Sequence, residues 1–557
     1  MVVSSATFPP SIVRPSGYLQ YPPIWHSNYV QSITKKLVIV NCSNPSRARM
    51  AVNSTSDEIN SVRKCGYSKY PPIWHFDYVQ SITNEFGEKE VDAINNLKDK
   101  VRMTLNEEIS DPLVQLEHID MLQRLGLYYH FEDEIDNILN AIYNNNDLGT
   151  GNLYAVALKF RLLRQHRYWV PQEVFNNFKD EMGNFKPCLR NDVMGLLSLY
   201  EASFLSRRGE IILDVARDFT TKHLQEFVRQ KELDENNYLS MLVGHALDVP
   251  LHWRVPRVEA RWFIDTYKRK EDLDPTFIEL AVLDFNVVQS VHLEEVKQLY
   301  RWWTDIGLAK KMKFSRDRLV ENALWNAGVL FEPQYGYLRK TVTKLFMLMS
   351  IVDDIYDTYG ALDDLLGHGC NGCATRWTDV VESYLVEAKW YHSGTTPPFQ
   401  EYIENAWISI TVPMTYLVGY LCVTNPIREE ALEFLLENSS IIRESSLIQR
   451  LANDLVTSTF ELKKGDVPSS INCYMHEFGA SEDEARQHIK FLINEAWKQT
   501  NEDQAAKSPF SQKFIEFIIN GNRMTLWFYD GRDGYGVENI CETKDCASSF
   551  FFEPIPS

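Results

Sequence analysis

Apolar residues recur at intervals of three and four along most of the chain from about residue 85 onward. Residues 113–127, 153–165, 193–205 and 287–302 show this spacing, which is that of one face of an α-helix. Short breaks rich in Asn and Gly separate the segments. Few stretches alternate between apolar and polar residues as strands do. The pattern therefore predicts an all-α fold.

A chain of 557 residues is too long for one ordinary core, so two domains are expected. We place their boundary near residue 270, where the charged run 268–272 precedes Leu273, Asp274 and Pro275. Asp followed by Pro favours the start of a helix. The predicted parts are a leader at 1–56, an N-terminal helical domain at 57–270 and a C-terminal helical domain at 271–557.

Residues 405–427 carry no charge and are long enough to be tested as a membrane span. They include Pro413, polar Asn425 and several Ser and Thr, and no second such stretch accompanies them. We therefore favour a buried bundle helix, or a pair of helices lining an apolar cavity, over a membrane span.

The net charge of −19 argues against a nucleic acid partner, because phosphate backbones are bound by clustered Lys and Arg. It leaves a small phosphorylated substrate open, since bound divalent cations can reverse the charge of a local site. Nine cysteines without a framework spacing indicate a reducing compartment. Cys370 and Cys373 form a C-x-x-C beside His368, but no second ligand pair supports a zinc site there.

Residues 1–56 contain no Asp or Glu, ten Ser and five basic residues, a composition typical of an organelle transit peptide. A merely disordered tail is the alternative. Residues 21–34 also recur at 70–83, with 12 of 14 positions identical. We interpret the first copy as a duplicated fragment within the leader and the second as the working copy.

Three carboxylates follow an apolar helical stretch at residues 345–352: Asp353, Asp354 and Asp357. On a helix, Asp353 and Asp357 share one face. Carboxylates at the end of an apolar helix repel one another and resist burial. Mg²⁺ relieves both problems because it prefers oxygen ligands and bridges carboxylates to substrate phosphates. A solvated acidic helix end is the alternative.

A second polar stripe has the spacing i, i+4, i+8 and consists of Asn453, Thr457 and Glu461. This spacing is common on surface helices, so by itself it is weak evidence for a metal site. It gains weight because the chain also carries the first stripe of oxygen ligands. Two opposing helices with oxygen ligands could hold several Mg²⁺ around a diphosphate. Arginines suited to phosphate geometry accompany the stripes, namely Arg316, Arg318 and Arg450.

An apolar, aromatic cavity beside these stripes would keep water away from the site. Phe346 lies seven residues before Asp353, on nearly the same helix face and two turns deeper. Its ring should shorten the cavity. The candidate wall residues are Phe346, Trp325, Trp407 and Tyr529. For each of them, ordinary core packing is the alternative role.

These motifs resemble the plant terpene synthase family, and in particular its flowering-plant subfamily of largely monoterpene synthases. Asp353, Asp354 and Asp357 match the DDxxD motif of the family. The Asn453 stripe matches its second metal motif, and Arg316 with Arg318 matches its RxR motif. The resemblance runs from about Arg63 to the C-terminus. It implies a relict N-terminal α-barrel-like domain and an active C-terminal class I terpenoid synthase helix bundle.

The resemblance further implies a plastid enzyme of the chloroplast stroma, or a cytoplasmic one if the leader does not function. The expected reaction is ionisation of an allylic diphosphate, geranyl diphosphate first, to a monoterpene and diphosphate. About three Mg²⁺, with Mn²⁺ as a substitute, would assist. We expect a monomer. Sesquiterpene synthase and isoprene synthase activities remain alternatives, as does a catalytically inactive synthase-like protein.

Three departures from the family pattern stand out. Arg63-Lys64 replaces the tandem arginines ahead of Trp74, and Arg167 stands where relatives carry Gly. Asp353 and Asn453 are roughly 40–45 residues closer than in relatives, which is two helices' worth of chain. The helical pattern breaks down at 367–374, so we infer an internal deletion after Leu366.

Overall fold

The computed structural model of the chain describes residues 74–83, 88–106, 111–145, 148–230, 237–308, 317–359, 375–437, 439–464, 468–531, 534–535 and 540–556. They belong to one compact unit, Arg63–Ser557. The leader, with the first copy of the repeat, lies outside the described residues. So do the Arg63-Lys64 pair, Arg316 and the segment that contains Cys370 and Cys373.

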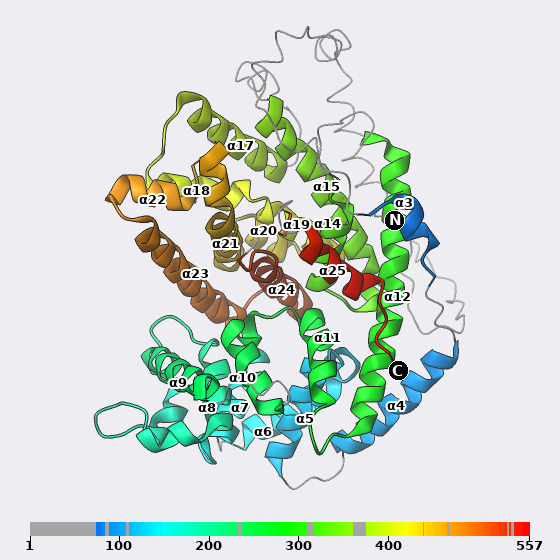
Figure 1. The fold of residues 1–557 in the computed structure, drawn as a ribbon, viewed down its shortest axis with the longest axis vertical. Coiled ribbons are helices and arrows are strands. Elements are labelled where there is room, and N and C mark those ends of the chain that lie inside the picture. The colour runs from blue at the N-terminus through cyan, green and yellow to red at the C-terminus, as the bar shows by residue number, and fades with distance from the viewer. Residues whose placement is uncertain are drawn as a thin grey trace, which may run out of the picture. The chain divides into compact units, whose positions relative to one another are not determined.

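Helices dominate the part of the chain that the structure describes, where an isolated bridge between Lys179 and Phe185 is the only β pairing (Figure 1). The all-α prediction is confirmed. The first half contains α3 (Phe76–Ser81), α4 (Glu88–Asn106), α5 (Pro112–Arg124), α6 (Glu132–Asn144), α7 (Leu153–Gln165), α8 (Val193–Ser203), α9 (Ile211–Gln230), α10 (Tyr238–Asp248), α11 (Pro256–Tyr267) and α12 (Pro275–Ile306).

The second half supplies the helices that carry both polar stripes. They are α14 (Leu319–Val329), α15 (Gly336–Tyr359), α17 (Thr375–Ser393), α18 (Phe399–Ser409), α19 (Val412–Val423), α20 (Glu429–Leu436), α21 (Ser440–Lys464), α22 (Ser470–Phe478), α23 (Glu482–Ala505), α24 (Gln512–Phe528) and α25 (Ile540–Phe551).

The long helix α12 begins where the sequence predicts a helix start. The Asp274 side chain accepts a hydrogen bond from the Thr276 backbone N–H, and Pro275 occupies the first turn, where its missing N–H costs nothing. Gly307 ends the helix with a φ of 66°, in the left-handed region that glycine adopts without strain.

Helix α12 also joins two separate hydrophobic cores. Phe277, Phe285 and their neighbours pack with the N-terminal helices, whereas Leu293 to Trp303 pack with α14 through α25. One continuous helix thus belongs to both cores (Figure 1). The domain boundary near residue 270 stays a prediction.

The uncharged stretch at 405–427 forms parts of two helices. Helix α18 ends at Ser409, and α19 begins after Thr411, whose φ is 67°. Within the described residues, Phe399–Val423 is long and apolar enough to cross a membrane. However, 56% of the 18-residue apolar segment within it is buried inside the protein. Tyr402, Trp407 and Tyr416 are among the buried side chains. This agrees with the predicted pair of buried bundle helices.

The second copy of the repeat, described from Trp74 to Thr83, packs against α12 and α25. Tyr300 Oη donates to the Trp74 carbonyl at 3.1 Å, and Lys297 Nζ donates to the Ile82 carbonyl at 2.7 Å. The Trp74 ring meets Phe552 edge to face at 4.8 Å. This copy therefore packs as an integrated part of the C-terminal half.

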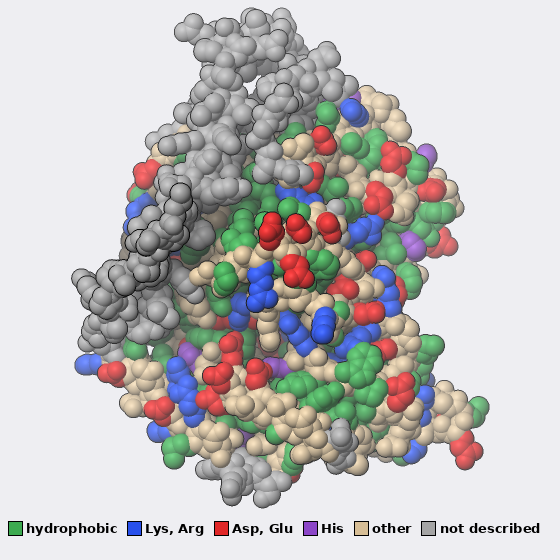
Figure 2. All heavy atoms as spheres, turned by 180° about the vertical axis from the view of Figure 1, so that it is seen from behind, with side chains coloured by type: hydrophobic (Ala, Val, Ile, Leu, Met, Phe, Trp, Pro, Cys, Tyr) green, Lys and Arg blue, Asp and Glu red, His purple; other side chains and the backbone are tan. Residues whose placement is uncertain are grey.

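Charged groups also join the two halves. Lys513 of α24 lies 2.9 Å from Glu332, 2.8 Å from Glu516 and 3.4 Å from Glu132 of α6. Burial lowers the pKa of Lys513, but the carboxylates outweigh it and hold that pKa above its ordinary value. On the outer surface, acidic and basic side chains are interspersed over the face seen in Figure 2, so the net charge of −19 is not gathered into one patch there.

Arg167 closes the C-terminal end of α7 in a conformation that suits glycine. Its φ is 66°. The Arg167 N–H donates to the Arg164 carbonyl at 3.1 Å, and the Tyr168 N–H donates to the Leu163 carbonyl at 3.0 Å. This pair of bonds defines a Schellman turn, whose left-handed residue is usually Gly. The turn therefore gives a physical reason to expect glycine at this position.

We therefore expect Arg167→Gly to stabilise the protein by about 1 kcal/mol, because it removes left-handed strain from a residue with a Cβ. Lys222→Gly is the control: Lys222 is exposed in the middle of α9, and glycine there should destabilise by about 1 kcal/mol. Urea unfolding of both variants measures the difference. A loss of stability in Arg167→Gly would contradict the strain argument.

Candidate active site

The first acidic stripe lies in the C-terminal half of α15. The helix buries Leu345, Met347 and Ile351 and then presents two carboxylates. Asp353 is half-buried, and Asp354 is 1% exposed. The backbone of Asp357 continues the helix, while its side chain lies outside the described residues. The apolar helix with an acidic end is thus present as predicted.

The second stripe lies on one continuous helix, α21. Asn453 and Thr457 are half-buried, and Thr457 Oγ1 donates to the Asn453 carbonyl at 3.2 Å. Glu461 follows on the same helix, with its side chain outside the described residues. Because α15 and α21 both pack on α19, the two stripes flank one helix of the bundle.

Glu387 of α17 connects the two stripes electrostatically. Its carboxylate accepts hydrogen bonds from Ser409 Oγ at 2.5 Å and from Asn405 Nδ2 at 3.4 Å. Burial raises the pKa of Glu387, Arg450 lowers it, and the negative charge of Asp353 raises it again. Asp353 from α15 and Arg450 from α21 therefore act on the same carboxylate.

Arg450 lies close to three other side chains. Its Nε donates to Tyr402 Oη at 2.8 Å and lies 2.9 Å from Asp454 Oδ1. Its Nη1 lies 3.9 Å from Glu387 Oε1, and its guanidinium sits 5.4 Å from the centre of the Tyr402 ring. The Arg450 side chain is 15% exposed, whereas Asp454 is fully buried. An arginine anchored in this way is suited to binding an anion in a fixed orientation.

Arg318 precedes α14 and is 4% exposed. Its Nη1 lies 3.4 Å from Glu321 Oε1, and its buried Nε has no hydrogen-bond partner among the described residues. Burial raises the pKa of Glu321 to about 7, although Arg318 opposes the shift. The second arginine of the RxR motif is therefore buried and incompletely partnered.

Sequence reasoning missed Glu387, Tyr402 and Asp454. Asp454 stands beside Asn453 and one turn after Arg450, so a buried ion pair on α21 could have been inferred from the spacing. Glu387 interrupts the apolar stretch Tyr384–Val386 ahead of Ala388, which is a weaker signal. Nothing in the sequence indicates that Tyr402 contacts Arg450 from another helix.

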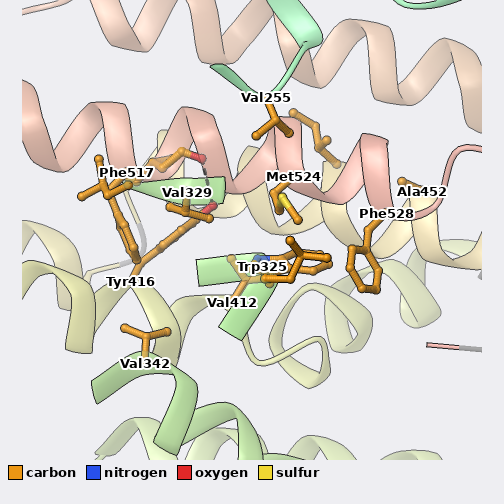
Figure 3. Close-up of a cluster of buried hydrophobic side chains, with 14 of the residues drawn as sticks. Val255, Trp325, Val329, Val342, Val412, Tyr416, Ala452, Phe517, Met524 and Phe528 are labelled. Carbon is orange, nitrogen blue, oxygen red and sulfur yellow. Dashed lines mark hydrogen bonds between the residues drawn. The ribbon is translucent and has the colours of Figure 1, made fainter. Parts of the chain in front are cut away.

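Three of the four predicted wall residues lie in one aromatic cluster. Trp325 of α14 meets Phe346 at a ring distance of 6.3 Å, Phe528 at 5.1 Å and Tyr529 at 6.3 Å. Figure 3 shows Met524 and Phe528 of α24 gathered around Trp325. Phe346 and Tyr529 are half-buried. The fourth residue, Trp407, is buried on α18.

The donors of the two stripes suit a hard divalent cation. Asp353, Asp354, Asn453 and Thr457 all offer oxygen, the ligand that Mg²⁺ prefers. Asp353 also lies close enough to Glu387 for the two negative charges to interact, and a cation would relieve that repulsion. Among the described residues no three His, Cys, Asp or Glu side chains are clustered for a metal, and the carboxylates of Asp357 and Glu461 lie outside that set.

Two family models match the chain: "Terpene synthase, N-terminal domain" over residues 73–247, and "Terpene synthase family, metal binding domain" over 304–368 and 366–499. Together they cover more than half of it. The chain belongs to the terpene synthase family. Its metal-binding domain matches in two pieces that meet at 366–368, where the sequence predicts the junction of a deletion.

Curated relatives and solved structures agree with this membership. The terpene synthase is 50% identical over 518 residues to a chloroplastic myrcene synthase of Quercus ilex, covering 84% of this chain and 86% of the relative. It is 47% identical over 519 residues to a (-)-alpha-terpineol synthase of Vitis vinifera, covering 85% of this chain and 87% of the relative. The alignment spans 518 positions, but only 84% of the 557 residues of this chain take part in it, which is fewer than 518 residues. The Quercus ilex enzyme therefore has residues without counterparts here.

A crystal structure of limonene synthase with 2-fluorolinalyl diphosphate superposes with a TM-score of 0.84 at 36% identity, covering 89% of this chain and 100% of that one. Isoprene synthase from grey poplar, in complex with three Mg²⁺ and dimethylallyl-S-thiolodiphosphate, gives a TM-score of 0.78 at 36% identity, covering 87% and 99%. The terpene synthase thus has the all-α fold of these enzymes.

Asp353→Ala should abolish turnover, because it removes a predicted metal ligand from the first stripe. The helical circular dichroism signal should remain, since Asp353 is half-buried at the end of a well-packed helix. Glu433→Ala, on the exposed face of α20, is the control and should leave turnover unchanged. Product formation by Asp353→Ala at the rate of the unaltered enzyme would rule out this ligand assignment.

Proposed function

We propose that this enzyme ionises geranyl diphosphate in the presence of Mg²⁺ and releases a monoterpene and diphosphate. The observation that carries the proposal is that Arg450 of α21 is anchored by Tyr402 and Asp454 and lies 3.9 Å from Glu387 of α17. The negative charge of Asp353 on α15 also raises the pKa of the Glu387 carboxylate, whose side chain is 14% exposed. Oxygen ligands and an anchored arginine on neighbouring helices are what a diphosphate site requires.

We assign diphosphate binding to the arginines and metal binding to the stripes. Arg450 and Arg318, with Arg316 beside it, would bind the phosphate oxygens through their N–H groups. Mg²⁺, when bound, supplies positive charge that stabilises the departing diphosphate. The residues assigned to it are Asp353, Asp354, Asp357, Asn453, Thr457 and Glu461. The isoprene synthase structure with three Mg²⁺ supports the binding of about three Mg²⁺ ions at this site.

The aromatic cluster supplies the other half of the chemistry. Trp325, Phe346 and Tyr529 offer ring faces and apolar surface beside α15, where the hydrocarbon tail is expected to extend. Ring faces attract cations, and an apolar wall excludes the water that would capture a carbocation prematurely. We assign these side chains to binding and sheltering the substrate tail.

An acyclic monoterpene is the product that we propose. The half-buried ring of Phe346 narrows the space against Trp325 and so disfavours the folded substrate that ring closure needs. Myrcene synthases of Quercus ilex and Humulus lupulus, at 50% and 44% identity, support this proposal. A plastid location is proposed from the acid-free leader and from the chloroplastic names of relatives. A fluorescent fusion of residues 1–60 that stayed in the cytosol would overturn the location.

A catalytically inactive protein is the second candidate. The observation in its favour is the two-piece match of the metal-binding domain. A lost stretch after Leu366 would remove wall from the cavity and admit water. In the structure α15 and α17, on either side of the junction, pack against each other, which brings Glu387 close to the first stripe. This packing favours the active protein.

Purified chain incubated with Mg²⁺ and geranyl diphosphate should form a volatile monoterpene and release diphosphate. Gas chromatography of the headspace and a diphosphate assay measure the two products. Their absence would favour the inactive protein. A second arm inserts a helix pair of about 45 residues from a relative after Leu366. If the junction weakens the cavity, this insertion should raise both melting temperature and rate by burying exposed apolar surface.

Phe346→Ala should shift the products towards cyclic or larger terpenes, because it lengthens the cavity beside Trp325. The comparison is Phe528→Ala, which opens the far side of the same cluster, where Phe528 is 2% exposed. Either deletion of a buried ring should cost stability, by roughly 3–5 kcal/mol when burial is complete. An unchanged product profile in Phe346→Ala with lower stability would leave only a packing role.

A further inference from the structure

Tyr402 occupies the centre of a buried polar group behind Arg450. Its ring lies on α18, fully buried, and its hydroxyl reaches α21. The hydroxyl donates to Asp454 Oδ2 at 2.7 Å and accepts from Arg450 Nε at 2.8 Å. Burial raises the pKa of Tyr402 well above its ordinary value, so the hydroxyl keeps the proton that it donates. One oxygen therefore links the guanidinium to the carboxylate.

Asp454 fixes the other end of this group. Its Oδ2 also accepts the Ser470 backbone N–H at 2.9 Å, at the start of α22. Its Oδ1 lies 2.9 Å from Arg450 Nε. A fully buried carboxylate with backbone, hydroxyl and guanidinium partners is held in one place. Asp454 and Tyr402 together define where the Nε edge of Arg450 must lie.

The two edges of Arg450 have different surroundings. The Nε edge faces Tyr402 and Asp454, which are both fully buried. The Nη1 atom lies 3.9 Å from Glu387 Oε1 of α17, beyond hydrogen-bond distance. Because a guanidinium is planar, fixing Nε also fixes the plane of its outer donors.

We propose that Tyr402 is a positioning residue for diphosphate: its hydroxyl, backed by Asp454, holds Arg450 so that the outer guanidinium edge faces the space between the two stripes. This inference rests on the proposed function, in which Arg450 binds the substrate diphosphate. Tyr402 touches no reacting atom. It acts through the orientation of Arg450.

The test removes the hydroxyl and keeps the ring. Tyr402→Phe should weaken binding of inorganic diphosphate in the presence of Mg²⁺ by about tenfold, because a hydrogen bond to a charged group is lost. Titration calorimetry gives the Kd, and steady-state kinetics should show a raised KM for geranyl diphosphate. Tyr420→Phe is the matched control: within the described residues, the hydroxyl of this buried tyrosine of α19 forms hydrogen bonds to the Arg428 backbone, at 3.4 Å. It should leave the Kd unchanged.

A double-mutant cycle separates positioning from packing. Lysine has no Nε edge for Tyr402 to hold, so adding Tyr402→Phe to Arg450→Lys should change the Kd no further. If the two substitutions raise the Kd independently, so that their fold-changes multiply in the double variant, the proposal is wrong. If Tyr402→Phe does not fold, Asp454→Asn provides the second variant, and it should weaken diphosphate binding to a similar degree.

The outcomes distinguish this inference from the function on which it rests. If the unaltered enzyme neither forms product nor binds diphosphate with Mg²⁺, the proposed function fails and the positioning role fails with it. If the unaltered enzyme does both, and Tyr402→Phe binds diphosphate as Tyr420→Phe does, the function stands and the positioning role is wrong.

Discussion

Helix α21 imposes the constraint on which the catalytic bundle depends, because it carries a polar face into an apolar core. A buried charge without partners costs several kcal/mol, so each polar group on this face needs a partner from a neighbouring helix. Gln449 Nε2 donates to Tyr416 Oη of α19 at 2.7 Å. Asp454 accepts from Tyr402 of α18 and from the start of α22. The buried polar groups of α21 thus help to fix how α18, α19 and α22 pack against it.

The same constraint indicates which negative charges remain for a bound cation to neutralise. Arg450 and Asp454 compensate each other within α21, but Asp353 and Glu387 carry like charges that act on one another. The interval between the stripes therefore has an excess of negative charge. Divalent cations would offset this excess and create a positive surface for diphosphate.

Local periodicity was enough to predict the helices and the two stripes, since α15 and α21 each carry their motif on one uninterrupted helix. It was not enough to predict Tyr402 or Glu387, whose contacts with Arg450 depend on how α17 and α18 pack against α21. The strain at Arg167 could be inferred only from its φ in the folded chain, because the sequence alone shows only an unusual residue. Periodicity reports which face is buried but not which residue lies opposite.

The position of the junction determines what a lost stretch can affect. It falls between α15 and α17, whereas the partners of Arg450 lie on α17, α18 and α21 and all follow it in the sequence. These helices keep their polar contacts in the chain as it stands. Wall area and water exclusion are the properties that a missing helix pair would change. We therefore propose that diphosphate affinity depends on α21 and its partners, whereas the fate of the carbocation depends on the enclosure around the aromatic cluster.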